Sequence, residues 1–120
     1  MNNEAVVLVA SRNRVALVEA LLDAGLTPLE RTGIRETVAT LRREPTAAVL
    51  VDATGGDVDV LELLLNIRDF SPSVGIGVIG DDKAFEELTP LLRDFEDVLL
   101  LPAGAPPAEV VEDFLKNVRF

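Results

Sequence analysis

A buried strand that ends in an acid constrains this chain more than any other feature. Residues 46–69 read TAAVLVDATGGDVDVLELLLNIRD. The apolar run 47–51 leads directly into Asp52, a turn-rich patch with Gly55 and Gly56 follows, and an apolar helical pattern comes next. A continuous apolar run of this kind is typical of a parallel strand covered on both faces. Because ligands of open parallel sheets bind at the carboxyl ends of the strands, Asp52 is the first candidate for a functional residue.

The same alternation of apolar strand and amphipathic helix continues along the whole chain. The expected strands are 5–9, 28–32, 47–51, 74–79 and 98–101. The expected helices are 14–24, 34–43, one that ends near Phe70, 83–95, and one from Pro107 to about Val118. Strands that alternate with helices predict right-handed crossovers and one parallel sheet covered on both faces. We therefore predict an α/β fold, a three-layer α/β/α sandwich that forms a single domain over residues 1–120.

Individual residues mark where these elements begin and end. Gly25 is a natural stop for the first helix, and Asp57 or Asp59 is placed to cap the third. Pro90 must kink or split the helix expected at 83–95.

Two interior patterns predict packing. In the second helix Val38 and Leu41 are expected to face inward. In the strand 74–79, Gly75 and Gly77 predict either a bulge or the close approach of a neighbouring element.

The balance of charge argues against several partners. The chain carries 21 acids against 11 bases and a net charge of −10, with scattered arginines and two lysines. Nucleic-acid grooves need clustered cations, and anionic lipid attracts basic segments. Trp and Tyr are absent, so platforms for stacking bases would be poor. We expect no direct binding of nucleic acid or membrane.

The missing residue types narrow the chemistry further. There is no His, the commonest general base, and no Cys. Ser11 has no base or nucleophile-elbow pattern around it, so we expect it to cap the first helix. Gly55-Gly56 lacks the spacing and the lysine of a phosphate loop. We therefore predict no enzyme activity.

Localisation follows from two further absences. No apolar run approaches the roughly 18 residues that span a bilayer, and the N-terminus lacks the basic region of a signal peptide. We expect a cytoplasmic protein.

The order and spacing of these landmarks resemble the receiver domain of two-component response regulators. VVLVAS stands at the first strand, Gly33 opens the second helix, and Asp52 stands at the place of the phospho-acceptor aspartate. Asp59 follows seven residues later, and Leu101-Pro102 stands where the family has Lys-Pro. The resemblance covers the whole chain. It implies a CheY-like, flavodoxin-like fold with strand order 2-1-3-4-5, in either a small protein or a domain of a longer regulator.

The departures from the family pattern bear directly on function. Where receivers have two acids that hold Mg²⁺, this chain has Ala10 and Ser11. Gly80 replaces the Thr or Ser that follows the phosphoryl oxygen, and Leu101 replaces the Lys that pairs with it. Val98 replaces the Tyr or Phe that turns inward on activation. The resemblance therefore implies a degenerate receiver, a pseudo-receiver.

These losses predict poor phosphorylation chemistry. Phosphoryl transfer is catalysed almost entirely by positioning and charge neutralisation. Asp52 and the carbonyl of Thr54 would be only two protein ligands for Mg²⁺, which prefers near-octahedral oxygen geometry. We expect no cofactor, and a vestigial Asp52. If a cation binds at all, Asp81 and Asp82, which follow the fourth strand, are the acids to test, although such loop acids commonly cap helices.

Three functions remain open. The first is a signalling domain that acts by protein–protein contact, with a histidine kinase or an output domain as partner. The second is an atypical receiver of a two-component phosphorelay, which uses Asp52 and Mg²⁺ with Asp81 or Asp82 as a substitute acid. The third is a small-ligand module on the same fold.

In the family the face of helix four, strand five and helix five serves output and dimerisation. In this chain the apolar residues of that region are Phe85, Leu88, Leu92, Phe95, Val98, Val110, Phe114 and Phe120. We expect most of them to face the core and two or three to contribute to a docking or homodimer surface.

Overall fold

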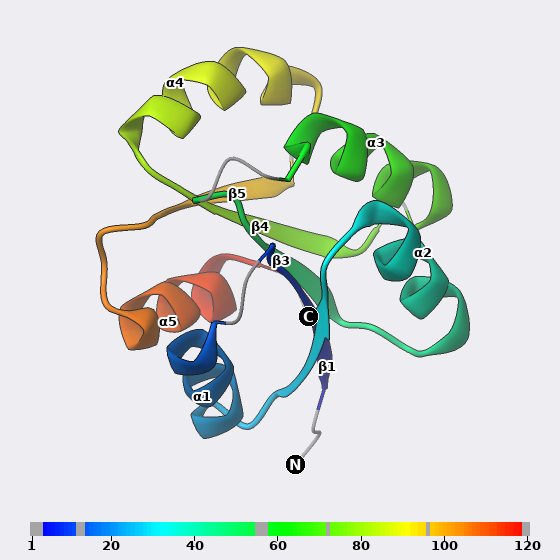
Figure 1. Cartoon of the computed structure of the whole chain (residues 1–120), viewed down its shortest axis with the longest axis vertical. Coiled ribbons are helices and arrows are strands. Elements are labelled where there is room, and N and C mark those ends of the chain that lie inside the picture. The colour runs from blue at the N-terminus through cyan, green and yellow to red at the C-terminus, as the bar shows by residue number, and fades with distance from the viewer. Residues whose placement is uncertain (1–3, 12–13, 55–57, 72, 96, 119–120) are drawn as a thin grey trace.

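Five parallel strands form one sheet in the order β2-β1-β3-β4-β5, as the sequence predicted. The computed structural model describes residues 4–11, 14–54, 58–71, 73–95 and 97–118. The strands are β1 (Ala5–Val9), β2 (Thr27–Arg31), β3 (Ala48–Asp52), β4 (Gly75–Gly80) and β5 (Val98–Pro102). The helices are α1 (Val15–Asp23), α2 (Ile34–Arg43), α3 (Val60–Phe70), α4 (Asp82–Leu91) and α5 (Pro107–Asn117), and a 3₁₀ turn, η1 (Leu92–Asp94), follows α4 (Figure 1).

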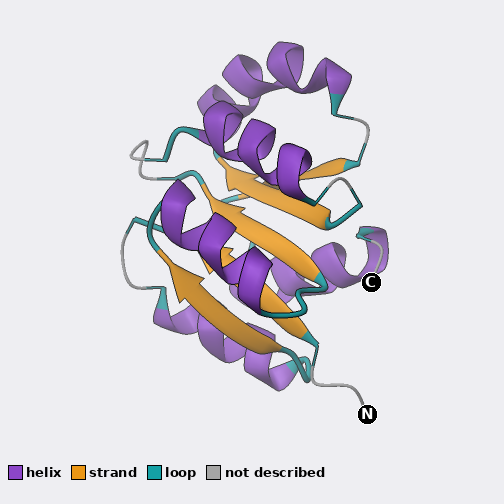
Figure 2. Ribbon diagram, turned by 90° about the vertical axis from the view of Figure 1, so that its right-hand side faces the viewer, coloured by secondary structure: helices purple, strands orange, loops and turns teal. Residues whose placement is uncertain are grey.

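The helices cover both faces of the sheet. Helices α1 and α5 lie on one face, and α2, α3 and α4 lie on the other (Figures 1 and 2). Alternate residues of each strand point to opposite faces. In β3, Val49 and Val51 pack with α3 and α4, whereas Ala48 and Leu50 pack with α1 and α5. This two-sided burial explains why the central strands β1, β3 and β4 read as continuous apolar runs, whereas the edge strand β2 does not.

Most of the predicted boundaries are confirmed. Gly25 has a φ of +83°, the left-handed conformation that favours glycine after a helix. The carboxylate of Asp59 accepts a hydrogen bond from the Glu62 backbone N–H at 3.1 Å and caps α3, and Asp57 lies outside the described residues. The helix expected at 83–95 is divided into α4, which contains Pro90 in its last turn, and η1, which begins at Leu92. None of the helices within the described ranges is long and apolar enough to span a membrane.

The inward face of α2 was predicted wrongly in part. Thr37 and Thr40 are the buried residues of this helix. Leu41 is half-buried and packs against the core, as predicted, whereas Val38 is half-buried and lines a surface groove. The Thr37 hydroxyl donates to the Gly33 carbonyl at 2.8 Å, and the Thr40 hydroxyl donates to the Glu36 carbonyl. Because these bonds satisfy the hydroxyls within the helix, threonine can take a core position that we had assigned to apolar residues.

Gly77 marks a close approach between β4 and α5. A Cβ atom built at Gly77 would lie 2.7 Å from Cδ1 of Phe114, closer than real side chains come. Phe114 is fully buried, so only glycine leaves room for its ring at this point of the strand. Of the two alternatives for the strand glycines, close packing is therefore correct for Gly77.

Candidate functional site

Asp52 ends β3, and its side chain lies buried at the carboxyl edge of the sheet. The side chain is only 2% exposed. It follows Leu50 by two residues, so it points to the face that α1 and α5 cover. Arg14 stands at the N-cap position of α1 on that same face. The folding of β3 and α1 onto one another therefore brings these two residues together, although they are far apart in the sequence.

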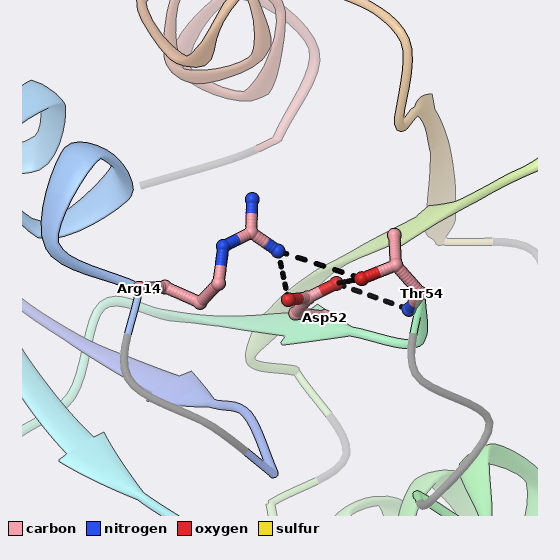
Figure 3. A network of polar contacts seen from close by, with 3 residues as sticks. All are labelled: Arg14, Asp52 and Thr54. Atoms are coloured by element: carbon pink, nitrogen blue, oxygen red, sulfur yellow. Dashed lines mark hydrogen bonds and ion pairs between the residues drawn. The ribbon is translucent and has the colours of Figure 1, made fainter.

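Both oxygens of the Asp52 carboxylate are engaged. Nη1 of Arg14 donates to Oδ2 and forms an ion pair with it (Figure 3). The Thr54 backbone N–H donates to Oδ1 at 3.0 Å, and the Thr54 hydroxyl donates to the same oxygen at 2.6 Å. A second contact of 3.5 Å joins Arg14 Nη1 to the Thr54 hydroxyl. The three residues form one polar network around a buried carboxylate.

The network stabilises the negative charge of Asp52 in its buried position. A buried carboxylate without a partner is strongly unfavourable. Arginine is always charged and presents several donors in a fixed plane, which suits a carboxylate. The Arg14 side chain is 24% exposed, so its far side reaches water while Nη1 contacts Asp52. The negative charge of Asp52 is thus balanced by a cation of the chain itself.

Ala10 and Ser11 lie beside the network without contributing to it. Ala10 is buried, and its backbone N–H donates to the Arg31 carbonyl at 3.0 Å. Ser11 is exposed and does not cap α1, since Arg14 is the N-cap and no side chain caps this helix. The expectation for Ser11 as a cap was wrong, because the helix begins four residues later, at Val15. Within the described residues, no group of three or more acids is arranged to hold a metal.

The ends of β4 and β5 are apolar. A Cβ atom at Gly80 would lie 3.1 Å from both Ala84 Cβ and Phe85 Cε1, so α4 already fills the space of a side chain there. Leu101 is 1% exposed and belongs to the core formed with α1 and α5. The Leu101–Pro102 peptide is trans, like every other peptide of the described residues. This part of the edge offers neither a side-chain hydroxyl nor a cation at these two positions.

Asp81 serves a helix terminus. Its carboxylate accepts a hydrogen bond from the Ala84 backbone N–H at 2.8 Å and caps α4. Asp82 is the exposed first residue of that helix. We had named helix capping as the common role of such loop acids, and Asp81 has this role.

The apolar residues of α4, β5 and α5 divide between core and surface. Phe114 is fully buried, and Leu88 is 9% exposed. We had included both residues in a possible docking face, and their burial corrects that prediction. Phe114 packs against Gly77 of β4, and Leu88 packs in the core with α3. Leu92 and Val110 are also buried, whereas Phe85, Phe95 and Val98 are half-buried. Phe120 lies outside the described residues.

Sequence reasoning missed Arg14, the residue that contacts Asp52. We had considered it only as the start of a helix. A signal was present: the acids expected after the first strand are absent, and a cation stands a few residues further on. In a chain that keeps Asp52 without its metal-binding acids, a nearby arginine is the natural compensating charge.

The chain has the fold of response regulator receiver domains, of the CheY-like type. The chemotaxis response regulator CheY4 of Vibrio cholerae superimposes with a TM-score of 0.80 at 14% identity, over 96% of this chain and 98% of that one. A receiver protein from Sinorhizobium medicae gives 0.72 at 17% identity, over 94% of each chain. The signal receiver domain of an HD domain-containing protein from Pseudomonas fluorescens gives 0.80 at 16% identity, over 98% of this chain and 88% of that one. No protein-family model matches the sequence, and no curated protein matches it either.

Proposed function

We propose that this chain is a signal-transduction receiver-like domain that acts by protein–protein contact and without conventional Mg²⁺-dependent phosphorylation of Asp52. The observation that carries the proposal is the ion pair between Arg14 and Asp52. The guanidinium lies against the carboxylate oxygen that a metal or a phosphoryl group would need. In this proposal Arg14 is a permanent counter-ion, and Asp52 is a structural residue.

The donor set around Asp52 does not suit Mg²⁺. A hard divalent cation needs several oxygen ligands in near-octahedral geometry. Positions 10 and 11 supply no carboxylate, and the Asp81 carboxylate is used as a helix cap. Displacing Arg14 would also leave its charge beside the incoming cation, which adds repulsion. We therefore propose a domain without a metal cofactor.

The remaining partners of a phosphoryl group are missing as well. Catalysis of phosphoryl transfer depends on donors and cations placed around the transferred group. Gly80 brings no hydroxyl, and Leu101 is turned into the core. The proposed partner is therefore a protein, such as a kinase or an output domain. We propose no enzymatic activity for this chain, and we propose that it works in the cytoplasm.

An amide NMR titration with Mg²⁺, followed by beryllofluoride as a mimic of the phosphoryl group, tests this proposal. We expect the resonances of Ala10, Asp52, Gly80 and Leu101 to stay unchanged at millimolar Mg²⁺. Asp52→Asn is the matched control, because any shift that persists in it arises elsewhere on the acidic surface. Shifts at these four residues that spread along β5 would contradict the proposal and point to a working phospho-acceptor.

A gain-of-function variant tests whether Arg14 occupies the place of the metal. The variant Ala10→Asp/Ser11→Asp/Arg14→Ala/Leu101→Lys restores the acid pair and the lysine of the receiver pattern and removes the internal cation. We expect it to respond to millimolar Mg²⁺, and we expect the same variant with Arg14 retained to respond more weakly. Equal responses would mean that Arg14 does not occupy the place of the metal.

A further inference from the structure

Two grooves of opposite charge lie on opposite faces of the sheet. The first, of about 690 Å³, runs between α2 and α3. Its exposed cations, all on α2, are Arg35, Arg42 and Arg43, and its apolar lining comes from Ile34, Val38 and Ala39. Helix α3 contributes Asn66 and one acid, Glu62, so cations outnumber acids by three to one in this lining. The second, of about 470 Å³, runs between α1 and α5 on the other face of the sheet (Figures 1 and 2). Its acids are Glu19, Asp23 and Glu112. We call these the basic groove and the acidic groove.

The arginines of the basic groove are concentrated in a chain that is otherwise strongly acidic. The ion pairs found among the described residues are Arg14–Asp52 and Lys116–Glu112, so neither involves this groove. Arg42 lies over the Phe70 ring, 5.3 Å from its centroid, and Nε of Arg43 donates to the Ala39 carbonyl at 3.3 Å. The Arg42 guanidinium therefore leans toward α3, and the Arg43 guanidinium is held against α2. Helix α2 is the arginine-rich wall of the basic groove.

The acidic groove is shaped to receive a helix. Small side chains line it, among them Ala16 and Ala20 of α1 and Ala108 of α5. Small residues let a second helix approach closely, so that its ridge packs into the groove. Glu112 contacts Lys116 at 3.3 Å, but both side chains are about two-thirds exposed, and such a surface pair is weak enough to exchange partners.

We propose that α2 of one molecule docks into the acidic groove of a second copy of the same chain. The chain supplies both halves of the contact: a helix that carries three arginines, and a groove that carries three acids. A second copy is therefore favoured over another acidic protein, because the chain itself carries the complementary charge. This surface differs from the α4–β5–α5 face, and the inference does not depend on the proposed role of Asp52.

The placement of the grooves determines the type of assembly. A contact between two different surfaces is heterologous and leaves each partner with one unused groove. Because the two grooves lie on opposite faces of the sheet, the association does not close as a two-fold dimer, and it extends to larger rings or open chains. The large net negative charge of each copy opposes association. We expect a weak, concentration-dependent assembly.

Sedimentation velocity over a concentration series tests the inference with two neutralised variants. The basic-groove variant is Arg35→Gln/Arg42→Gln/Arg43→Gln, and the acidic-groove variant is Glu19→Gln/Asp23→Asn/Glu112→Gln. All six side chains are exposed, so the fold is kept. We expect wild type to form species larger than a dimer as its concentration rises. Each variant alone should associate at least about tenfold more weakly.

The decisive sample is the equimolar mixture of the two variants. Each variant keeps one native groove, so the mixture can form one native contact per pair and should stop at a 1:1 dimer. Glu86→Gln/Glu87→Gln on α4 is the control outside both grooves and should associate at least as strongly as wild type, because it also removes negative charge. The acidic-groove variant removes negative charge and so lowers the general repulsion between copies. A nonspecific charge effect would therefore strengthen the association of this variant, so a weaker association would point to loss of the specific contact.

Three results would overturn the inference. A wild-type protein that stays monomeric at millimolar concentration would exclude a second copy as the occupant, and α2 and α3 amide shifts on adding an acidic peptide would then assign the basic groove to another protein. Association of either variant at wild-type strength would place the interface elsewhere. A mixture that stays monomeric, while wild type associates, would show that the two grooves do not bind each other.

Discussion

The carboxyl ends of β3 and of β4–β5 lie along the same edge of the sheet, yet they are built in opposite ways. At β3, buried Asp52 is surrounded by donors from Arg14 and Thr54. At β4 and β5, Gly80 and Leu101 are enclosed by apolar side chains of the helices. A phosphoryl site needs polar groups from both parts of this edge. One part of the edge therefore holds a charge that is balanced internally, whereas the other part belongs to the apolar core.

The largest effect is expected in the apolar part of the edge. Phe114→Ala should lower the free energy of unfolding by about 3–5 kcal/mol, because it removes a fully buried ring and leaves a cavity beneath β4. Urea denaturation measures the loss. Phe85→Ala, at a half-buried position, is the control and should cost clearly less. Equal losses would mean that burial beneath β4 does not set the stability of this part.

A glycine substitution tests the same packing from the strand side. Gly77→Ala should cost about 1–3 kcal/mol, since the new methyl group would overlap the Phe114 ring. Combining it with Phe114→Leu should recover part of that cost, because the smaller side chain leaves room for the methyl group. A double-mutant cycle in urea measures the coupling. Strictly additive losses would contradict the close approach.

In the charged part of the edge, substitutions of Arg14 and of Asp52 should lower the free energy of unfolding by different amounts. Arg14→Met leaves a buried carboxylate without its cation and should cost about 1–3 kcal/mol, less than for a fully buried pair because Arg14 is 24% exposed. Asp52→Asn should cost about 1 kcal/mol or less, because the Asn oxygen can still accept from Thr54 and Arg14 can turn to water. Thermal unfolding of both variants measures the difference. A larger cost for Asp52→Asn would contradict the role of Arg14 as counter-ion.

The smallest effect is expected at the acid that follows β4. Asp81→Ala should cost about 1 kcal/mol through loss of the α4 cap. Asp81→Asn is the matched control, because its side-chain oxygen can still accept from the Ala84 N–H, so it should cost much less. Chemical denaturation of the two variants makes the comparison. If the Asn variant lost as much as the Ala variant, the charge of Asp81 would matter beyond capping.

The fold was predictable because two-sided burial leaves a plain signature. Strands such as β3 read as continuous apolar runs, and their order follows from the resemblance to receivers. The inward face of α2 was not predictable in the same way. Thr37 and Thr40 are polar by composition but satisfy their hydroxyls within the helix, so a hydropathy pattern misplaces them.

The candidate site was predictable only in part. The place of Asp52 at the sheet edge follows from the strand pattern. Its contact with Arg14 depends on where α1 begins and on the length of the arginine side chain. The two residues are 38 positions apart in the sequence, so local patterns do not report their contact. Within the expected partner face, Leu88 and Phe114 are buried, because spacing alone does not tell a buried Phe114 from an exposed one.

The cation beside Asp52 is covalently part of the chain, and this has a consequence for how the site can respond to the cell. Because Arg14 is tethered, it competes with cations in solution for the Asp52 carboxylate at an effective concentration that the chain sets, typically millimolar or higher. In the proposed function, free magnesium must displace Arg14 before it can bind to Asp52, and magnesium depletion leaves the carboxylate paired with Arg14. The site would then respond neither to ion levels nor to phosphoryl donors, and information that passes through this domain would arrive with the molecule that touches its surface.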